Sequence, residues 1–118
     1  MSLFGLRSAF GAGIQSAGRA LVHALDSDDE NVRTLAGMFL VQSGRKSIPL
    51  IREEIAARRH LPMMLTMLGD IAAPETVPEI ERFTTDSDPA VARAANDALE
   101  IVRLNRAASS SATAASQG

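Results

Sequence analysis

A short pattern of residues occurs twice in this chain, at positions 59 residues apart. In each copy an aspartate is followed by a valine, an alanine and a leucine: Asp29, Val32, Ala36 and Leu40 in the first copy, and Asp88, Val91, Ala95 and Leu99 in the second. An aspartate side chain can accept a hydrogen bond from the free backbone amides at the start of a helix. Residues three or four apart share one helical face. The pattern therefore predicts two capped helices that carry the same apolar stripe.

A second pattern recurs after 29 residues and supplies the helices between these two. The matched residues are Ser47, Ile48, Pro49 and Ile51 in one copy, and Thr76, Val77, Pro78 and Ile80 in the other. A hydroxyl side chain can cap a helix, and proline is tolerated in the first turn because its missing amide hydrogen has no partner there. Thr76 and Glu79 also have the spacing of a capping box. We therefore expect a repeat of about 29–30 residues, each repeat being a helical hairpin.

The repeat register predicts three successive hairpins, formed by residues 18–25 with 31–42, 48–58 with 61–71, and 77–84 with 89–105. Short polar links make neighbouring helices antiparallel, and hairpins with one apolar stripe each must stack to bury it. Aromatic residues make up only 3% of the chain, which argues against a small β-sandwich or barrel. The predicted fold class is all-α, with a repeat domain over residues 18–106.

The segment Asp88–Ala95, followed by Leu99, resembles the second helix of a HEAT repeat, and most closely the short HEAT-like repeats found in phycobilisome lyases. Residues 29–40 are similar. The resemblance covers about residues 18–105 and implies a right-handed α-solenoid of about three HEAT-like hairpins. It also implies a binding surface, because such repeats mostly bind other proteins. The middle repeat departs from the pattern, since His60–Pro62 stands where the aspartate cap and the Val-Arg pair would be.

The two ends of the chain differ from the repeats. Residues 1–17 are expected to form an amphipathic arm, because apolar residues recur there at roughly helical spacing while glycines weaken the helix. These apolar residues are Leu3, Phe4, Leu6, Phe10 and Ile14. We expect the arm to dock on the end of the solenoid, on a second chain or on a membrane surface. Residues 107–118 contain only Ala, Ser, Thr, Gln and Gly, which predicts a flexible tail.

Composition and spacing exclude several kinds of site. The chain has no cysteine, so it has no disulfide framework and no thiolate zinc site. The acidic run at residues 26–30 lacks the glycine and glutamate that a calcium loop requires. The two histidines, His23 and His60, fall in different predicted hairpins and have no metal-ligand spacing. We therefore expect no catalytic residue, no bound metal and no cofactor.

Three methionines are the strongest candidates for a partner-binding surface. Met38, Met63 and Met67 fall at positions that the repeat register places on the solvent side of the second helices. Flexible methionine side chains suit a surface that must adapt to a partner. The alternative is that the central repeat is simply more buried, in which case these side chains belong to the core.

A local group of arginines is the second candidate surface. Arg52, Arg58 and Arg59 belong to the one positively charged cluster of the chain. We interpret them as a solvated face or as contacts with an acidic partner. Nucleic acid is not the expected partner, because the net charge is −2, Glu53 and Glu54 interrupt the cluster, and the cluster contains no aromatic side chain for base stacking.

These features together predict a non-catalytic protein-interaction module, an adaptor or accessory subunit that binds a protein through its second helices. A chaperone-like or lyase-type role on a chromophore-bearing or other client protein remains an alternative, implied by the family resemblance. A membrane-associated scaffold that attaches through the N-terminal arm is a further alternative. Self-association into a homo-oligomer also stays open, and the expected location is cytoplasmic.

Overall fold

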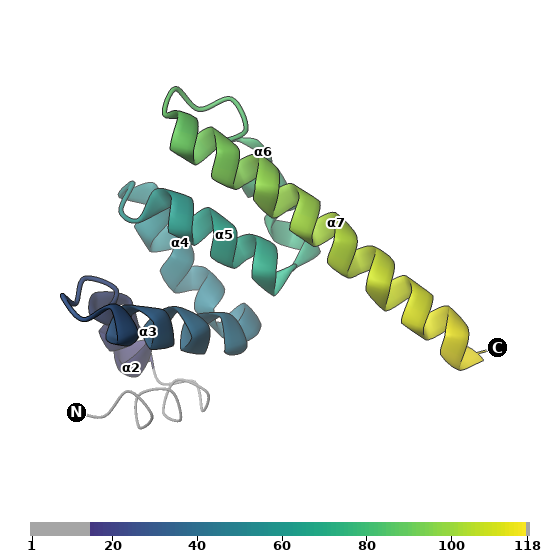
Figure 1. Ribbon diagram of the computed structural model, residues 1–118, viewed down its shortest axis with the longest axis horizontal. Helices are drawn as coiled ribbons and strands as arrows, with labels where there is room; N and C mark the ends of the chain where they lie inside the picture. The colour runs from purple at the N-terminus through teal and green to yellow at the C-terminus, as the bar shows by residue number, and fades with distance from the viewer. Residues whose placement is uncertain (1–14, 118) are drawn as a thin grey trace. The chain divides into compact units, whose positions relative to one another are not determined.

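The computed structural model describes residues 15–117, and it describes the side chains of residues 18–108. Every regular element in that part of the chain is a helix (Figure 1), which confirms the all-α class. The chain divides into two compact units, the first ending at Arg59 and the second beginning at His60. Each unit is described below by itself.

The described part of the first unit contains α2 (Gln15–Ala24), α3 (Glu30–Gln42), the short 3-10 helix η1 (Gly44–Ser47) and α4 (Ile48–Ala56). The helix α2 packs against α3 and also contacts α4. As the sequence predicts, Asp29 caps α3, because its carboxylate accepts a hydrogen bond of 2.8 Å from the backbone amide of Asn31. The core side chains of this unit are Leu21, Leu25, Ala36, Phe39, Leu40, Ile48, Leu50 and Ile51.

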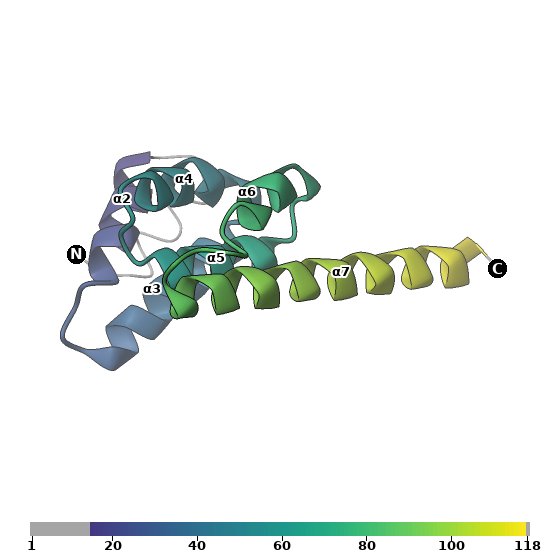
Figure 2. The same cartoon turned by 90° about the horizontal axis from the view of Figure 1, so that it is seen from above.

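The second unit contains α5 (Leu61–Ile71), the 3-10 helix η2 (Pro74–Thr76), α6 (Val77–Glu81) and the long helix α7 (Pro89–Gln117). The helix α7 packs against both α5 and α6, and it continues well past them (Figure 2). Its start is capped as predicted, since the Asp88 carboxylate accepts a hydrogen bond of 2.9 Å from the amide of Ala90. The buried stripe of α7 consists of Val91, Ala95, Ala98 and Val102.

The two hydroxyl residues of the second pattern lie where the sequence places them, but they do not cap their helices. Neither Ser47 nor Thr76 makes a side-chain hydrogen bond to an amide at the start of α4 or α6, so the predicted capping box of Thr76 is wrong. Both side chains are fully buried. The Ser47 hydroxyl donates to the carbonyl oxygen of Leu40, and the Thr76 hydroxyl donates to that of Ala73 at 2.7 Å. A 3-10 turn precedes each helix, so the hydroxyl faces back along the chain and finds a carbonyl oxygen instead of a free amide.

The helix α7 extends to Gln117, beyond the predicted end at residue 105. Residues 107–117, expected as a flexible tail, therefore have helical backbone. Alanine has the highest helix propensity of all residues, and this segment contains neither a glycine nor a proline before Gly118 that would stop the helix. The flexibility of residues 107–118 stays a prediction.

The first and third predicted hairpins each fall inside one unit, as α2 with α3 and α6 with α7. The second predicted hairpin, α4 with α5, has one helix in each unit, so the continuous stack of hairpins stays a prediction. Within residues 15–117 no helix has the length and apolar composition needed to cross a membrane.

Candidate functional site

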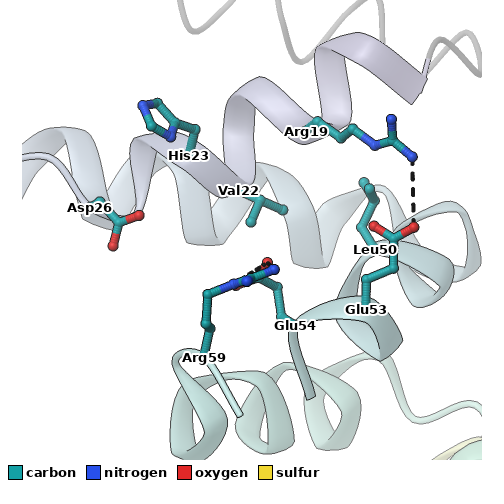
Figure 3. Close-up of a pocket in the computed structure, with 8 residues that line it drawn as sticks. All are labelled: Arg19, Val22, His23, Asp26, Leu50, Glu53, Glu54 and Arg59. Carbon is teal, nitrogen blue, oxygen red and sulfur yellow. Dashed lines mark hydrogen bonds and ion pairs between the residues drawn. The ribbon is translucent and has the colours of Figure 1, made fainter. Parts of the chain in front are cut away.

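The first unit has a polar pocket of about 280 Å³ between α2, α4 and the turn that follows α4 (Figure 3). The turn supplies Arg59, which is one of the residues singled out from the sequence. The lining residues are Arg19, Val22, His23, Asp26, Leu50, Glu53, Glu54 and Arg59. Five of these eight side chains are carboxylates or guanidinium groups, so the pocket is defined mainly by its charges.

The central interaction of this pocket joins Glu54 and Arg59. The Glu54 residue is only 7% exposed, and its carboxylate accepts hydrogen bonds from Arg59 Nε at 3.2 Å and from Arg59 Nη2 at 3.1 Å. The hydrogen bond and the charge of Glu54 together raise the pKa of the Arg59 guanidinium above its ordinary value. A buried carboxylate needs such a partner, because removing it from water is costly unless it is paired.

The backbone around Arg59 makes this contact possible. Arg58 and His60 both have positive φ angles, of 54° and 50°, and a non-glycine residue in the left-handed region costs about 1–2 kcal/mol. The turn reverses the chain tightly enough that the Arg59 amide donates to the Glu54 carbonyl oxygen at 2.9 Å. The same pair of residues is therefore joined through both backbone and side chain.

A second ion pair lies at the edge of the same pocket, where Arg19 Nη2 approaches Glu53 Oε1 at 3.6 Å (Figure 3). Both side chains are more than half exposed, so this pair contributes little to stability. The two arginines of the pocket thus each face a carboxylate of α4. The exposed pair of Arg19 and Glu53 could be exchanged for contacts with a charged partner at little cost, whereas the buried Glu54 needs Arg59. Among the described residues, no group of three His, Cys, Asp or Glu side chains could hold a metal ion.

The second unit has a recess of different character, about 270 Å³ in volume, between α6 and α7. Its floor is apolar and includes Val102, which is buried, together with the half-buried Val77 and Leu99. Two exposed arginines of α7, Arg103 and Arg106, form its rim. This recess combines an apolar cavity with positive charge.

The sequence analysis named Val77 and Leu99 as members of the repeat patterns but did not predict a recess there. The four residues from α7 are spaced three or four apart along one helical face: Leu99, Val102, Arg103 and Arg106. That spacing indicates a shared helical face, but the same spacing is also expected where the core stripe simply continues into solvent. Only the short helix α6, which brings Val77 against α7, turns the stripe into a recess.

Two of the three methionines predicted to be exposed are exposed. Met38 on α3 and Met63 on α5 are 48% and 39% exposed, as a partner-binding surface requires. Met67 is 4% exposed, so its predicted place on the solvent side is wrong. The helix α5 buries a face wider than a single stripe, formed by Leu61, Met64, Leu65, Met67, Leu68 and Gly69. The burial of Met67 fits the alternative that this side chain belongs to the core.

The predicted arginines have different surroundings. Arg59 lines the polar pocket and pairs with Glu54. Arg52 and Arg58 are exposed and line neither of the two pockets described above. The docking residues predicted in the N-terminal arm, Phe4, Leu6, Phe10 and Ile14, lie outside the residues that the structure describes.

Comparison of the chain with protein-family models, with curated proteins and with solved structures gave no match in any of the three. The resemblance to HEAT-like repeats therefore rests on the residues quoted for it, and function must be argued from the surfaces of this chain.

Proposed function

We propose that this protein is a non-catalytic protein-interaction module built from HEAT-like helical hairpins. The observation that carries the proposal is the exposure of two large apolar side chains on the predicted binding stripe. Within the part of the chain whose side chains are described, three large hydrophobic residues are exposed, namely Met38, Met63 and Leu104. Two of these three belong to the stripe that the repeat register predicts as a partner surface.

Their positions support a common role. In the repeat register Met38 of α3 corresponds to Met67 of α5, so Met38 and Met63 occupy sites one helical turn apart on equivalent helices. An exposed methionine keeps a flexible apolar side chain in water, and covering it with a partner is favourable by the hydrophobic effect. In this proposal Arg52 and Arg58 contribute polar contacts with an acidic partner.

The repeat character of the chain is supported by equivalent local structures. Asp29 and Asp88 cap α3 and α7 through the same type of hydrogen bond, made to the amide two residues further on. Ser47 and Thr76 are both buried and both donate to a preceding carbonyl oxygen. We propose on this basis that the hairpins stack as a right-handed solenoid, in which each hairpin buries its stripe against the next.

Substitution of the two exposed methionines tests the function. We expect the tagged wild-type chain to retain a specific protein from a lysate of its source cells, and we expect Met38→Glu and Met63→Glu to retain at least tenfold less of it. Leu104→Glu is the matched control, because it places the same charge at an equally exposed apolar site away from the stripe. Circular dichroism and thermal melts must show that all three variants stay folded. Equal capture by all of them would refute the proposed surface.

A further inference from the structure

The recess between α6 and α7 combines two features that point to one kind of ligand. Its floor is made by Val77, Leu99 and Val102, and its rim by Arg103 and Arg106. An apolar cavity of about 150 Å³ can hold benzene, so a recess of about 270 Å³ has room for one large aliphatic or aromatic side chain. The arginines at the rim would then face the residues of the ligand that neighbour this side chain.

The two arginines of the rim differ in their pairing with acidic residues of the chain. Arg103 is paired with Glu100, three residues earlier on α7, through hydrogen bonds from both Nε and Nη2. Arg106 is exposed and has no hydrogen bond or ion pair with any residue whose side chain the structure describes. The residues one helical turn away from it are Val102, Arg103, Ser109 and Ser110, none of which is acidic.

No acidic residue lies in the parts of the chain whose side chains are not described. The chain contains 14 Asp and Glu residues, and all of them lie between Asp26 and Glu100, within the described side chains. Residues 1–17 and 109–118 contain none. Among the described residues no side-chain carboxylate pairs with Arg106, so its guanidinium is available to a carboxylate of another molecule.

A second copy of this chain fits the recess poorly. Among the described side chains, the exposed large apolar residues that it could insert are Met38, Met63 and Leu104, and residues 1–17 contain no acidic residue to follow an apolar anchor. Met38 and Met63 have no acidic residue within one helical turn, and Glu100, which lies one turn from Leu104, is already paired with Arg103. A partner with a different sequence is therefore favoured.

We propose that this recess binds an acidic helical segment of a partner protein, in which a leucine or another large apolar residue is followed one turn later by a carboxylate. The apolar side chain occupies the space above Val102, and the carboxylate accepts hydrogen bonds from the Arg106 guanidinium, whose planar fork matches a carboxylate. A helix that inserts one apolar anchor into a groove is a common mode of peptide recognition. The inference rests on the proposed role as an interaction module and names the chemistry of one partner.

The test uses synthetic peptides and the full-length chain. The probe is a fluorescein-labelled, acetylated and amidated 14-residue peptide of Ala and Gln, with one leucine and, four residues later, one glutamate as its only charged residue. Two matched peptides replace the glutamate by glutamine or the leucine by serine. We expect the wild-type chain to bind the Leu/Glu peptide about threefold to fivefold more tightly than the Leu/Gln peptide, as a partly exposed ion pair allows. The Leu/Ser peptide should bind at least tenfold more weakly.

Variants of the chain locate the site. Arg106→Gln should remove the preference for glutamate over glutamine, while the control Arg93→Gln, at another exposed arginine of α7, should keep it. Val77→Glu should weaken all leucine-containing peptides, while Leu104→Glu should not. In ¹⁵N–¹H spectra of the wild-type chain, the peptide should shift the amides of Val77, Leu99 and Val102.

Several results would overturn the inference. These are no binding at millimolar peptide, an equal glutamate preference in the Arg106→Gln and Arg93→Gln chains, or shifted amides that lie elsewhere. Arg106-dependent self-association, or Arg106-dependent binding to vesicles with 30% anionic lipid without peptide binding, would also overturn it. If Arg106→Gln still captures the cellular partner that Met63→Glu loses, the interaction module stands and this recess is excluded as its site.

Discussion

A β-carbon placed on Gly69 of α5 would lie 2.8 Å from the Cα of Ala98 on α7. Atoms at that distance overlap, so the two helices approach more closely at this point than any residue larger than glycine allows. This close approach of the two helices also requires the small side chain of Ala98, which is fully buried at the same place. This pair fixes the spacing of the two helices that form most of the second unit.

Substitution of Gly69 by alanine should therefore destabilise the protein, although alanine is the better helix former. The helical preference alone would stabilise α5 by about 0.5–1 kcal/mol, whereas forcing a methyl group against the backbone of α7 costs about 1–3 kcal/mol. We expect a net loss in the free energy of unfolding measured by urea titration. Asp70→Ala, at the exposed neighbouring position, should change it by less than about 0.5 kcal/mol. A stabilised Gly69→Ala chain would show that the helices can move apart.

Removing the predicted caps should weaken α3 and α7 to a similar extent. Asp29→Ala and Asp88→Ala each delete the acceptor of a hydrogen bond from a free amide at the helix start, which costs about 0.5–2 kcal/mol. Asp28→Ala is the matched control for the first helix, because Asp28 is exposed and neighbours the cap without making that bond. If Asp28→Ala and Asp29→Ala lower the free energy of unfolding equally, charge near the helix is responsible and the hydrogen bond is not.

The buried hydroxyl of Thr76 should contribute more to stability than an exposed hydroxyl in the same local geometry. Thr76→Val keeps the shape of the side chain but deletes the donor to the Ala73 carbonyl oxygen, and we expect a loss of about 1 kcal/mol. Thr84 makes a similar bond to the Glu81 carbonyl oxygen in an exposed setting. Water can replace that bond, so Thr84→Val should have a smaller effect in the same chemical denaturation experiment.

The pairing of Arg59 with Glu54 should be insensitive to pH through the neutral and mildly alkaline range. The hydrogen bond and the negative charge of Glu54 raise the pKa of Arg59 above its ordinary value. The stabilisation that a raised pKa provides to a cation is complete below the unfolded pKa and is lost only as the pH rises through the folded one. Arg59→Gln should therefore lower the melting temperature by the same amount at pH 7 and at pH 10. A difference that vanishes by pH 10 would assign the effect to another group.

The positions of the helices could be predicted because they depend on local chemistry. Aspartate caps, prolines in the first turn and apolar spacing specify where α3, α4, α5 and α7 begin, and these helices start within one residue of the predicted positions. The 3-10 turns before α4 and α6 could not be foreseen, since a hydroxyl two residues before a proline can bond forwards or backwards along the chain. That choice depends on which carbonyl oxygen lies nearby.

The surfaces were harder to predict than the helices. The repeat register predicts exposure for all three methionines, and Met38 and Met63 are exposed, but Met67 is buried because α5 buries a face wider than a single stripe. The recess at Leu99 and Arg106 exists only because α6 lies beside α7. Such features depend on contacts between segments, which spacing within one helix does not reveal.

The length of α7 has a consequence for local stability. Its buried stripe ends at Val102, yet the helix continues to Gln117, about 22 Å further at 1.5 Å per residue. The part of α7 up to Val102 should unfold only with the unit that it packs in. An alanine-rich helix of this length is marginal without packing, so we expect the last part of α7 to open more readily. Amide exchange along this one helix should therefore fall into two regimes. Arg106 lies close to the point where they meet, so a ligand bound there would also extend the protected part of the helix.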